Sequence, residues 1–260
     1  MKWFGKSHSA EMPFLDHLEE LRWRIIWALL ALLIATGLGI GVVWKLPVVE
    51  LLKQPIDSYL PEGKLIFLAV TDAFFVKIKI ALALGFVLAS PIVFYQVWAF
   101  FAPALTRRER NAIVPALYLG LILFFGGVAL AYFVALPFTL QFMFSIETET
   151  MIPQITAGFY FGFVVKLLLG FGVLFEMPVV VLILSAIGLV TSQFLRSKRR
   201  YAIAGLAVLS ALMTPGDAIT ATVVLMGPLI LLYELSIVLA KLVERGRERG
   251  STSETVPGAT

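Results

Sequence analysis

Three carboxylates lie in sequence surroundings that could give them a chemical role, and Glu176 is the most unusual. It interrupts a long apolar run, in Phe175-Glu176-Met177-Pro178. A carboxyl at the middle of a membrane costs several kcal/mol unless it is protonated, hydrated or paired. Pro178 has no amide hydrogen, so a helix is expected to kink there. Glu176 and Pro178 predict a polar notch that contacts another transmembrane element or responds to protons. The alternative is a neutral glutamic acid hydrogen-bonded within its own bundle.

Glu20 lies in a segment, residues 14–24, whose apolar residues repeat at helical spacing. The apolar face consists of Leu15, Leu18, Leu21 and Ile25. This pattern predicts a helix that lies at a membrane surface before the chain turns into the first span. Residues 11–24 hold four acids and two bases, so a carboxylate here could receive a basic peptide. Alternatively, Glu20 pairs with Arg24 one turn later, a contact worth a few tenths of a kcal/mol.

Glu109 is the one acid within a short basic segment. Its neighbours are Arg107, Arg108 and Arg110. It could simply moderate their mutual repulsion, or the arginines could orient it as a second carboxylate near Glu20. Two carboxylates suit guanidinium groups because each accepts a bidentate pair of hydrogen bonds, which lysine does not reproduce.

The sequence contains no recognisable enzyme motif. Without cysteine there are no thiolate nucleophiles or cysteine metal sites, and the two histidines, His8 and His17, match no metal-ligand spacing. There is no phosphate-binding loop, no His-Glu-x-x-His and no Gly-x-Ser-x-Gly. Gly216-Asp217 could suggest an aspartyl intramembrane protease, but Asp217 has no second intramembrane aspartate. We therefore expect neither catalysis, nor a cofactor, nor a metal.

The composition is that of a membrane protein. Apolar residues make up 60% of the 260 residues and charged residues only 15%. A soluble domain of this size has too much surface to tolerate that ratio, so the apolar excess is expected to face lipid. The net charge of +4 is then better explained by basic loops on one side of a membrane than by nucleic-acid binding.

The apolar runs predict an all-α integral membrane protein with six transmembrane helices. They are residues 25–44, 74–101, 113–136, 159–189, 202–214 and 218–240. The fifth run has only about a dozen apolar residues, or roughly 18–20 Å of helix, against a hydrocarbon core of roughly 30 Å. A span that short should thin the bilayer around it.

Basic residues predict the orientation of these spans. If the N-terminus is cytoplasmic, 15 of the 21 lysines and arginines fall on the cytoplasmic side, so both termini are expected there. Residues 46–60 are expected to form a helix at the outer surface, and residues 138–153 have a similar composition. We divide the chain into a cytoplasmic segment (1–24), a membrane domain (25–242) and a disordered tail (243–260).

Polar and proline landmarks along residues 12–242 resemble those of the TatC family, the multispanning subunit of the twin-arginine protein translocase. The resembling stretches are residues 14–24, 89–105, 131–133, 175–178, 214–217 and 232–234. The resemblance implies recognition of signal peptides that bear consecutive arginines on folded cargo. The residues it assigns to peptide binding are Glu20, Leu21, Arg22, Phe100 and Glu109. Elsewhere it assigns Pro55 in the external loop, Glu176 within the membrane, and Thr214, Pro215 and Asp217 in the turn between spans five and six.

The resemblance also implies a fold and a set of partners. The fold is a concave, glove-like six-helix bundle without an aqueous pore. The partners are single-span proteins of the TatA type and, in some members of the family, of the TatB type. The resemblance further implies a homo-oligomeric receptor complex and export driven by the proton gradient across the cytoplasmic membrane. The main alternative is a secondary transporter or channel for a small solute, with Glu176 as its coupling group. That alternative predicts several intramembrane polar residues facing one another.

Overall fold

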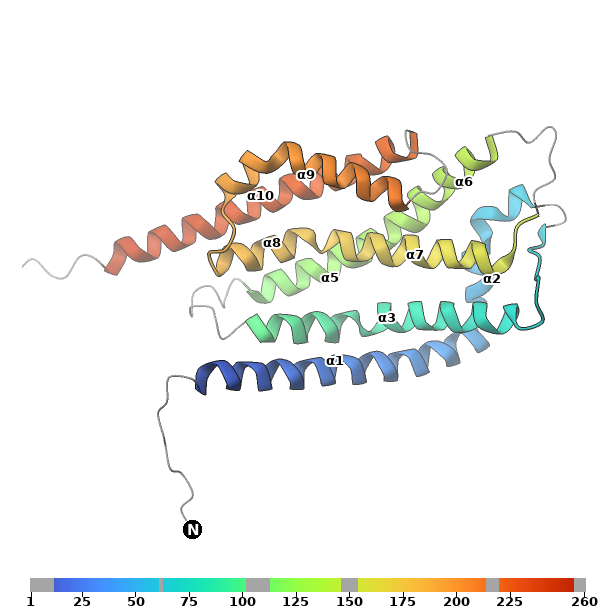
Figure 1. The fold of residues 1–260 in the computed structure, drawn as a ribbon, viewed down its shortest axis with the longest axis horizontal. Coiled ribbons are helices and arrows are strands. Elements are labelled where there is room, and N and C mark those ends of the chain that lie inside the picture. Colours follow the sequence, from blue (N-terminus) through green and yellow to red (C-terminus); the bar gives the residue numbers. More distant parts are fainter. Residues whose placement is uncertain (1–11, 61–62, 102–112, 146–153, 214–219, 255–260) are drawn as a thin grey trace, which may run out of the picture.

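The computed structural model describes residues 12–60, 63–101, 113–145, 154–213 and 220–254, and these are almost entirely helical (Figure 1). The elements are α1 (Met12–Lys45), α2 (Val48–Lys53), η1 (Gln54–Tyr59), α3 (Asp72–Phe101), α5 (Ile113–Leu130), η4 (Ala131–Ala135), α6 (Leu136–Ser145), α7 (Ala157–Phe175), α8 (Met177–Ala186), α9 (Ser192–Met213) and α10 (Thr220–Glu254). In the part of the chain that these ranges cover, β pairing is limited to one isolated bridge, between Ile66 and Thr156.

Five helical stretches in the described ranges are long and apolar enough to cross a membrane. They are His17–Lys45, Asp72–Phe101, Leu117–Ser145, Ala157–Ala186 and Met226–Arg245. The predicted fifth span, residues 202–214, is not among them; it falls in α9, a helix of 22 residues whose first half is basic. Its apolar part, residues 201–213, reaches about 20 Å at helical rise.

The long helices lie alongside one another, and the bundle has two distinct ends (Figure 1). At one end α1 begins, α3 and α8 end, and α9 begins; we call it the basic end because Arg22, Arg24, Arg196, Lys198, Arg199 and Arg200 lie there. At the other end α2 and η1 cover the helix termini, and we call it the capped end. The predicted outer-surface helix at residues 46–60 therefore exists, as two short helices.

α1 is one unbroken helix from Met12 to Lys45, so the predicted turn between a surface helix and the first span is wrong. Neither proline nor glycine occurs between Pro13 and Gly37 to interrupt it. α1 packs mainly on α3. A Cβ added at Gly85 of α3 would lie 2.6 Å from the Cα of Thr36, so the missing side chain is what allows the two backbones to approach.

Two prolines within apolar helices have different effects. Pro91 lies inside α3, which continues through it, and the hydroxyl of Ser90 donates a 2.8 Å hydrogen bond to the carbonyl of Val87 that the proline leaves without its helical donor. Pro178 follows the break between α7 and α8, where Glu176 adopts φ −75° and ψ −10° as the single residue between the helices. The predicted interruption at Glu176 is confirmed.

The third membrane stretch is longer than the sequence predicted. α5, the π-helical turn η4 and α6 follow one another without a gap to Ser145, so residues 138–145 continue the span and do not form a separate surface segment. The π turn places Tyr132 so that its hydroxyl donates a 2.6 Å hydrogen bond to the carbonyl of Leu51 in α2. The hydroxyl of Tyr160 in α7 donates to the next carbonyl, that of Leu52, at 2.7 Å.

α9 and α10 form an antiparallel pair along one side of the bundle (Figure 1). The hydroxyl of Tyr233 donates to the carbonyl of Leu195 at 2.7 Å, and Arg199 forms an ion pair with Glu234. α10 continues to Glu254, so the predicted disordered tail is helical over most of its length. Residues 241–249 are mainly leucine, valine, glutamate, lysine and arginine, and most of these types favour helix, which allows the last span to extend past its apolar part.

Candidate functional site

The first turns of α1 and the last turn of α3 meet at the basic end. The imidazole of His17 stacks on the ring of Phe100, with centroids 4.4 Å apart and planes 17° from parallel. Phe100 in turn meets Phe101 edge to face at 5.3 Å. This stack holds the turn of α1 that carries Glu20 against the end of α3. The segment that contains Glu109 follows α3 in the sequence.

Glu20 forms an ion pair within its own helix, as in the simpler of the two interpretations of the sequence. Arg24 donates from Nε to Oε1 at 3.0 Å and also from its terminal nitrogen, while Nδ1 of His17 lies 3.8 Å from Oε2. The Glu20 side chain is 34% exposed. A pair of this kind one turn apart is worth a few tenths of a kcal/mol, so another guanidinium group can replace Arg24 at little cost.

Only some of the other predicted site residues lie in the part of the chain that the structure describes. Leu21 is half-buried and Arg22 is exposed, both on α1 close to Glu20. Glu109 lies outside the described residues, so its proximity to Glu20 stays a prediction. Thr214, Pro215 and Asp217 also lie outside them. Pro55 is at the opposite end of the bundle, half-buried near the start of η1.

The carboxyl of Glu176 lies between α7 and α8 and points at the backbone of α5. A Cβ added at Gly120 would lie 3.0 Å from Oε2 and 3.4 Å from Oε1 of Glu176, so the absence of a side chain at Gly120 makes room for the carboxyl. Oε1 is buried, and within the described part of the chain it has no hydrogen-bond partner. The predicted alternative, a carboxyl satisfied inside its own bundle, is therefore not realised for this oxygen. An unsatisfied buried acceptor is costly, which makes it a candidate site for water or a partner group.

A small apolar cluster joins the notch to the basic end. Trp98 of α3 packs with Val179 and Ile183 of α8, one and two turns beyond Glu176, and Phe101 packs against the same cluster. The indole Nε1 of Trp98 is buried and also finds no acceptor among the described residues. The last turn of α3 thus contacts the turn of α1 that carries Glu20 through Phe100, and the region around Glu176 through Trp98 and Phe101.

Sequence reasoning did not predict a role for three of these residues. From the sequence, we consider His17 only as a metal ligand and assign no individual role to Gly120 or Trp98. Their roles depend on which helices pack together, and hydropathy does not reveal that. One signal was available for His17, because it lies one turn before Glu20 and so shares its helical face.

Comparison with known proteins agrees with this architecture. The profile of the TatC family, described as the Sec-independent protein translocase protein, matches residues 16–228. The Sec-independent protein translocase protein TatC of Aquifex aeolicus is 41% identical over 240 residues, which cover 91% of this chain and 98% of the relative. TatCy of Bacillus subtilis is 33% identical over 251 residues, covering 94% of each chain.

Solved structures agree as well. A crystal structure of the twin-arginine translocase receptor TatC superimposes with a TM-score of 0.75 at 39% identity, covering 88% of this chain and 99% of that one. A second crystal structure of that receptor, in DDM, gives a TM-score of 0.76 at the same identity. The family profile, the lengths of the relatives and the fold of the solved structures agree with this chain over nearly its whole length. The chain therefore belongs to the TatC family and is a membrane subunit of the twin-arginine translocase that acts in protein translocation.

Proposed function

We propose that this chain is the receptor subunit of its translocase, and that signal peptides with consecutive arginines dock at the basic end. The observation that supports this most is the His17–Phe100 stack, which brings the turn bearing Glu20 to the end of α3. In the proposal Glu20 exchanges its intrahelical Arg24 for an arginine of the peptide, and Glu109 receives the other. Leu21 and Arg22 line the approach on α1.

The proposal includes a topology. All six predicted spans cross the membrane, the one in α9 being short, and both termini are cytoplasmic. The charge supports this orientation, since the described ends of α9 and α10 on one side are rich in lysine and arginine, and the start of α1 adds Arg22 and Arg24. The concave glove-like shape and the thinning of the bilayer beside α9 belong to the same proposal.

Glu176 is proposed to serve a different step, the recruitment of TatA-type and TatB-type partner helices. Its Oε1 is buried without a bond in the described structure, so a polar group on an incoming helix would satisfy it. The cluster of Trp98, Val179 and Ile183 offers a physical connection between peptide docking and this notch. Assembly into receptor oligomers and dependence on the proton gradient are further parts of the proposal.

The test of the receptor function is complementation followed by cross-linking. The chain is expressed in a bacterium whose own TatC gene is deleted, and export of a folded twin-arginine reporter is measured. Photo-cross-linking from the twin-arginine region of the signal peptide should then be weakened by Glu20→Ala or Glu109→Ala and abolished by Glu20→Lys. Arg24→Gln is the matched control, because it removes the intrahelical pair but leaves the carboxylate, so cross-linking should be retained or increased.

Two outcomes would contradict the proposal. If cross-linking is undiminished in the Glu20→Ala, Glu109→Ala double variant, the role of Glu20 is limited to its ion pair with Arg24. Glu176→Gln should reduce co-purification of partner subunits more than it reduces peptide cross-linking. If the Glu176→Gln variant behaves like the wild type in both assays, Glu176 has a structural role only.

The short span provides a separate test. One extra turn of leucines inserted into residues 201–213 would lengthen the apolar part from about 20 Å to about 25 Å. We expect impaired export together with normal peptide cross-linking, because only the mismatch with the bilayer has changed. Normal export by this variant would reject a role for bilayer thinning.

A further inference from the structure

The loop before α3 exposes a continuous series of apolar side chains at the capped end. Phe67 is 53% exposed, Leu68 is 76% exposed and Val70 is fully exposed. Loops that connect helices outside a membrane are usually polar, so this loop departs from the ordinary pattern. An apolar patch of this kind requires an apolar or amphipathic neighbour.

Backbone hydrogen bonds hold the loop in its exposed conformation. The amide of Ile66 donates to the carbonyl of Ile155 at 3.0 Å, and the amide of Ala157 donates back to the carbonyl of Ile66 at 2.9 Å. On the other side, Oδ2 of Asp72 accepts from the amides of Leu68 and Ala69 at 2.9 and 3.0 Å. Anchored at both ends, the loop cannot fold its apolar side chains inward without breaking these bonds.

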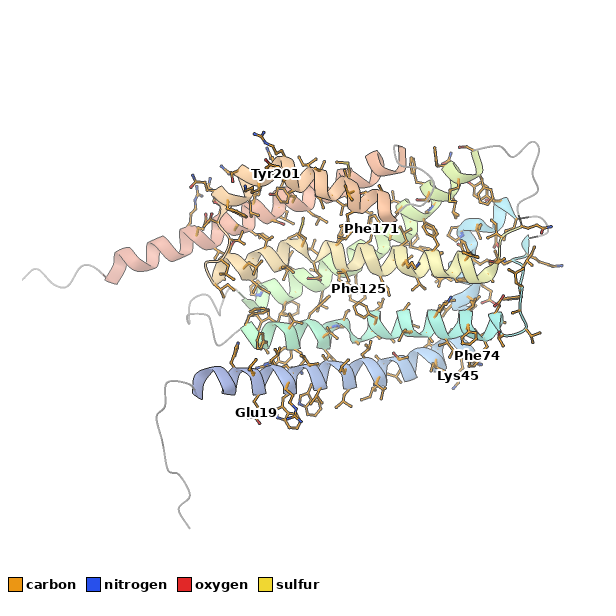
Figure 2. The ribbon with its side chains drawn as sticks, in the orientation of Figure 1. Glu19, Lys45, Phe74, Phe125, Phe171 and Tyr201 are labelled. Atoms are coloured by element: carbon orange, nitrogen blue, oxygen red, sulfur yellow. The ribbon has the colours of Figure 1, made fainter. Side chains whose placement is uncertain are left out.

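Neighbouring side chains are of the kinds found at a membrane–water interface. Nζ of Lys77 lies 5.3 Å from the centroid of the Trp44 ring, which joins α1 and α3 at the capped end. Lys45 and Phe74 lie at this same end (Figure 2). Phe74 and Phe75 are each 55% exposed in the first turn of α3. Tryptophan and snorkelling lysine mark the level of lipid headgroups in membrane helices.

The start of α3 relates the loop to these side chains. Phe74 precedes Lys77 by three residues, or about 4.5 Å along α3, and Asp72 two residues earlier binds the loop amides of Leu68 and Ala69. The headgroup layer on each side of a bilayer is about 5–8 Å thick beyond the hydrocarbon. A loop that adjoins the first turn of α3 is therefore within reach of a headgroup layer at the level of Trp44 and Lys77.

We propose that residues 66–70 form an interfacial anchor that inserts into the phospholipid headgroup layer at the capped end. Leu68 and Val70 contact the upper acyl carbons, while Lys45, Lys77 and Lys79 attract lipid phosphates. The anchor holds the capped ends of α1 and α3 at a defined depth. Charge complementarity favours lipid over a protein partner, because Lys45, Lys77 and Lys79 supply positive charge near the loop, while the Asp72 carboxylate accepts from the loop amides.

The absence of native cysteine makes a direct depth measurement possible. Single variants Leu68→Cys and Val70→Cys of the full chain are labelled with a nitroxide and reconstituted into phosphatidylglycerol–phosphatidylcholine vesicles. Ser58→Cys, at an exposed polar position of η1, is the matched control. Collision rates with oxygen, which partitions into lipid, and with a water-soluble nickel chelate are compared by electron paramagnetic resonance.

At positions 68 and 70 we expect the ratio of oxygen to nickel collisions to exceed the ratio at position 58 several-fold. The ratio should fall when Lys77 and Lys79 are replaced by glutamine or when phosphatidylglycerol is omitted. Equal ratios at all three sites would place the loop in water and overturn the proposal. Spectra that are immobilised and protected from both reagents would identify a protein neighbour, a second copy included, and would also overturn it. None of these outcomes depends on peptide recognition.

Discussion

His17 and Phe100 stack in parallel with ring centroids 4.4 Å apart, and this contact joins the start of α1 to the end of α3. The two residues are 83 positions apart in the sequence, so the contact exists only because α1 and α3 pack along their lengths. The contact holds the turn that carries Glu20 against the end of α3, where we propose that signal peptides dock.

Replacing His17 by alanine should weaken signal-peptide cross-linking about 2- to 10-fold, because an aromatic stack contributes about 0.5–1.5 kcal/mol. His17→Tyr restores a ring and should recover most of the signal. Cross-linking yield with a photoreactive signal peptide is the measurement. If tyrosine fails where histidine succeeds, the contact of the imidazole with Glu20 would matter more than the stack.

Gly120→Ala should destabilise the protein, although alanine ordinarily favours a helix. The new Cβ would lie 3.0 Å from Oε2 of Glu176 and force that carboxyl to move. Overpacking of this kind costs about 1–3 kcal/mol. Gly126→Ala in the same helix is the control, because nothing lies within 4 Å of its added Cβ. Thermal unfolding in detergent should show a lower Tm for the first variant only, and equal Tm values would contradict the placement of Glu176.

Ser90→Ala should leave the carbonyl of Val87 without a donor inside α3, at a cost of about 1–3 kcal/mol. The double variant Ser90→Ala, Pro91→Ala supplies the missing amide hydrogen and should recover the loss. Free energies of unfolding from a double-mutant cycle provide the measurement. Additive effects of the two changes would show that the Ser90 hydroxyl does not compensate for the proline.

Tyr132→Phe and Tyr160→Phe should each lower the free energy of unfolding by about 1 kcal/mol, because each removes one hydrogen bond to a carbonyl at the end of α2. For a chain of this size that corresponds to roughly 2–4 °C in Tm. Amide hydrogen exchange in α2 and η1 should accelerate at the same time. Tyr118→Phe, at a residue 64% exposed on α5, should change neither quantity.

Hydropathy and proline position predicted much of the fold. The ends of α3 agree to within two residues with the predicted span, and the break at Glu176 follows from the chemistry of Pro178. Pro91 shows the limit of that reasoning. Its chemistry is the same, yet α3 continues because the hydroxyl of the preceding Ser90 donates to the free carbonyl.

The remaining errors arise from contacts between distant segments. The π turn at Tyr132 and the carbonyl of Leu51 it binds are 81 residues apart, and no local pattern indicates the pairing. The residues of the candidate site fall into the same two groups, those that local sequence identifies and those that only packing identifies. The sequence identified Glu20 and Glu176 by their unusual surroundings, whereas His17, Gly120 and Trp98 gain importance only from the helices packed against them.

The close packing of α1 on α3 has a consequence for biogenesis. α1 is synthesised first and packs mainly on α3, the next long helix to emerge. The Gly85–Thr36 approach requires no residue from the second half of the chain. The first two spans can therefore assemble as a hairpin while later helices are still being made, and α7, which contacts both α3 and α5, can join it afterwards.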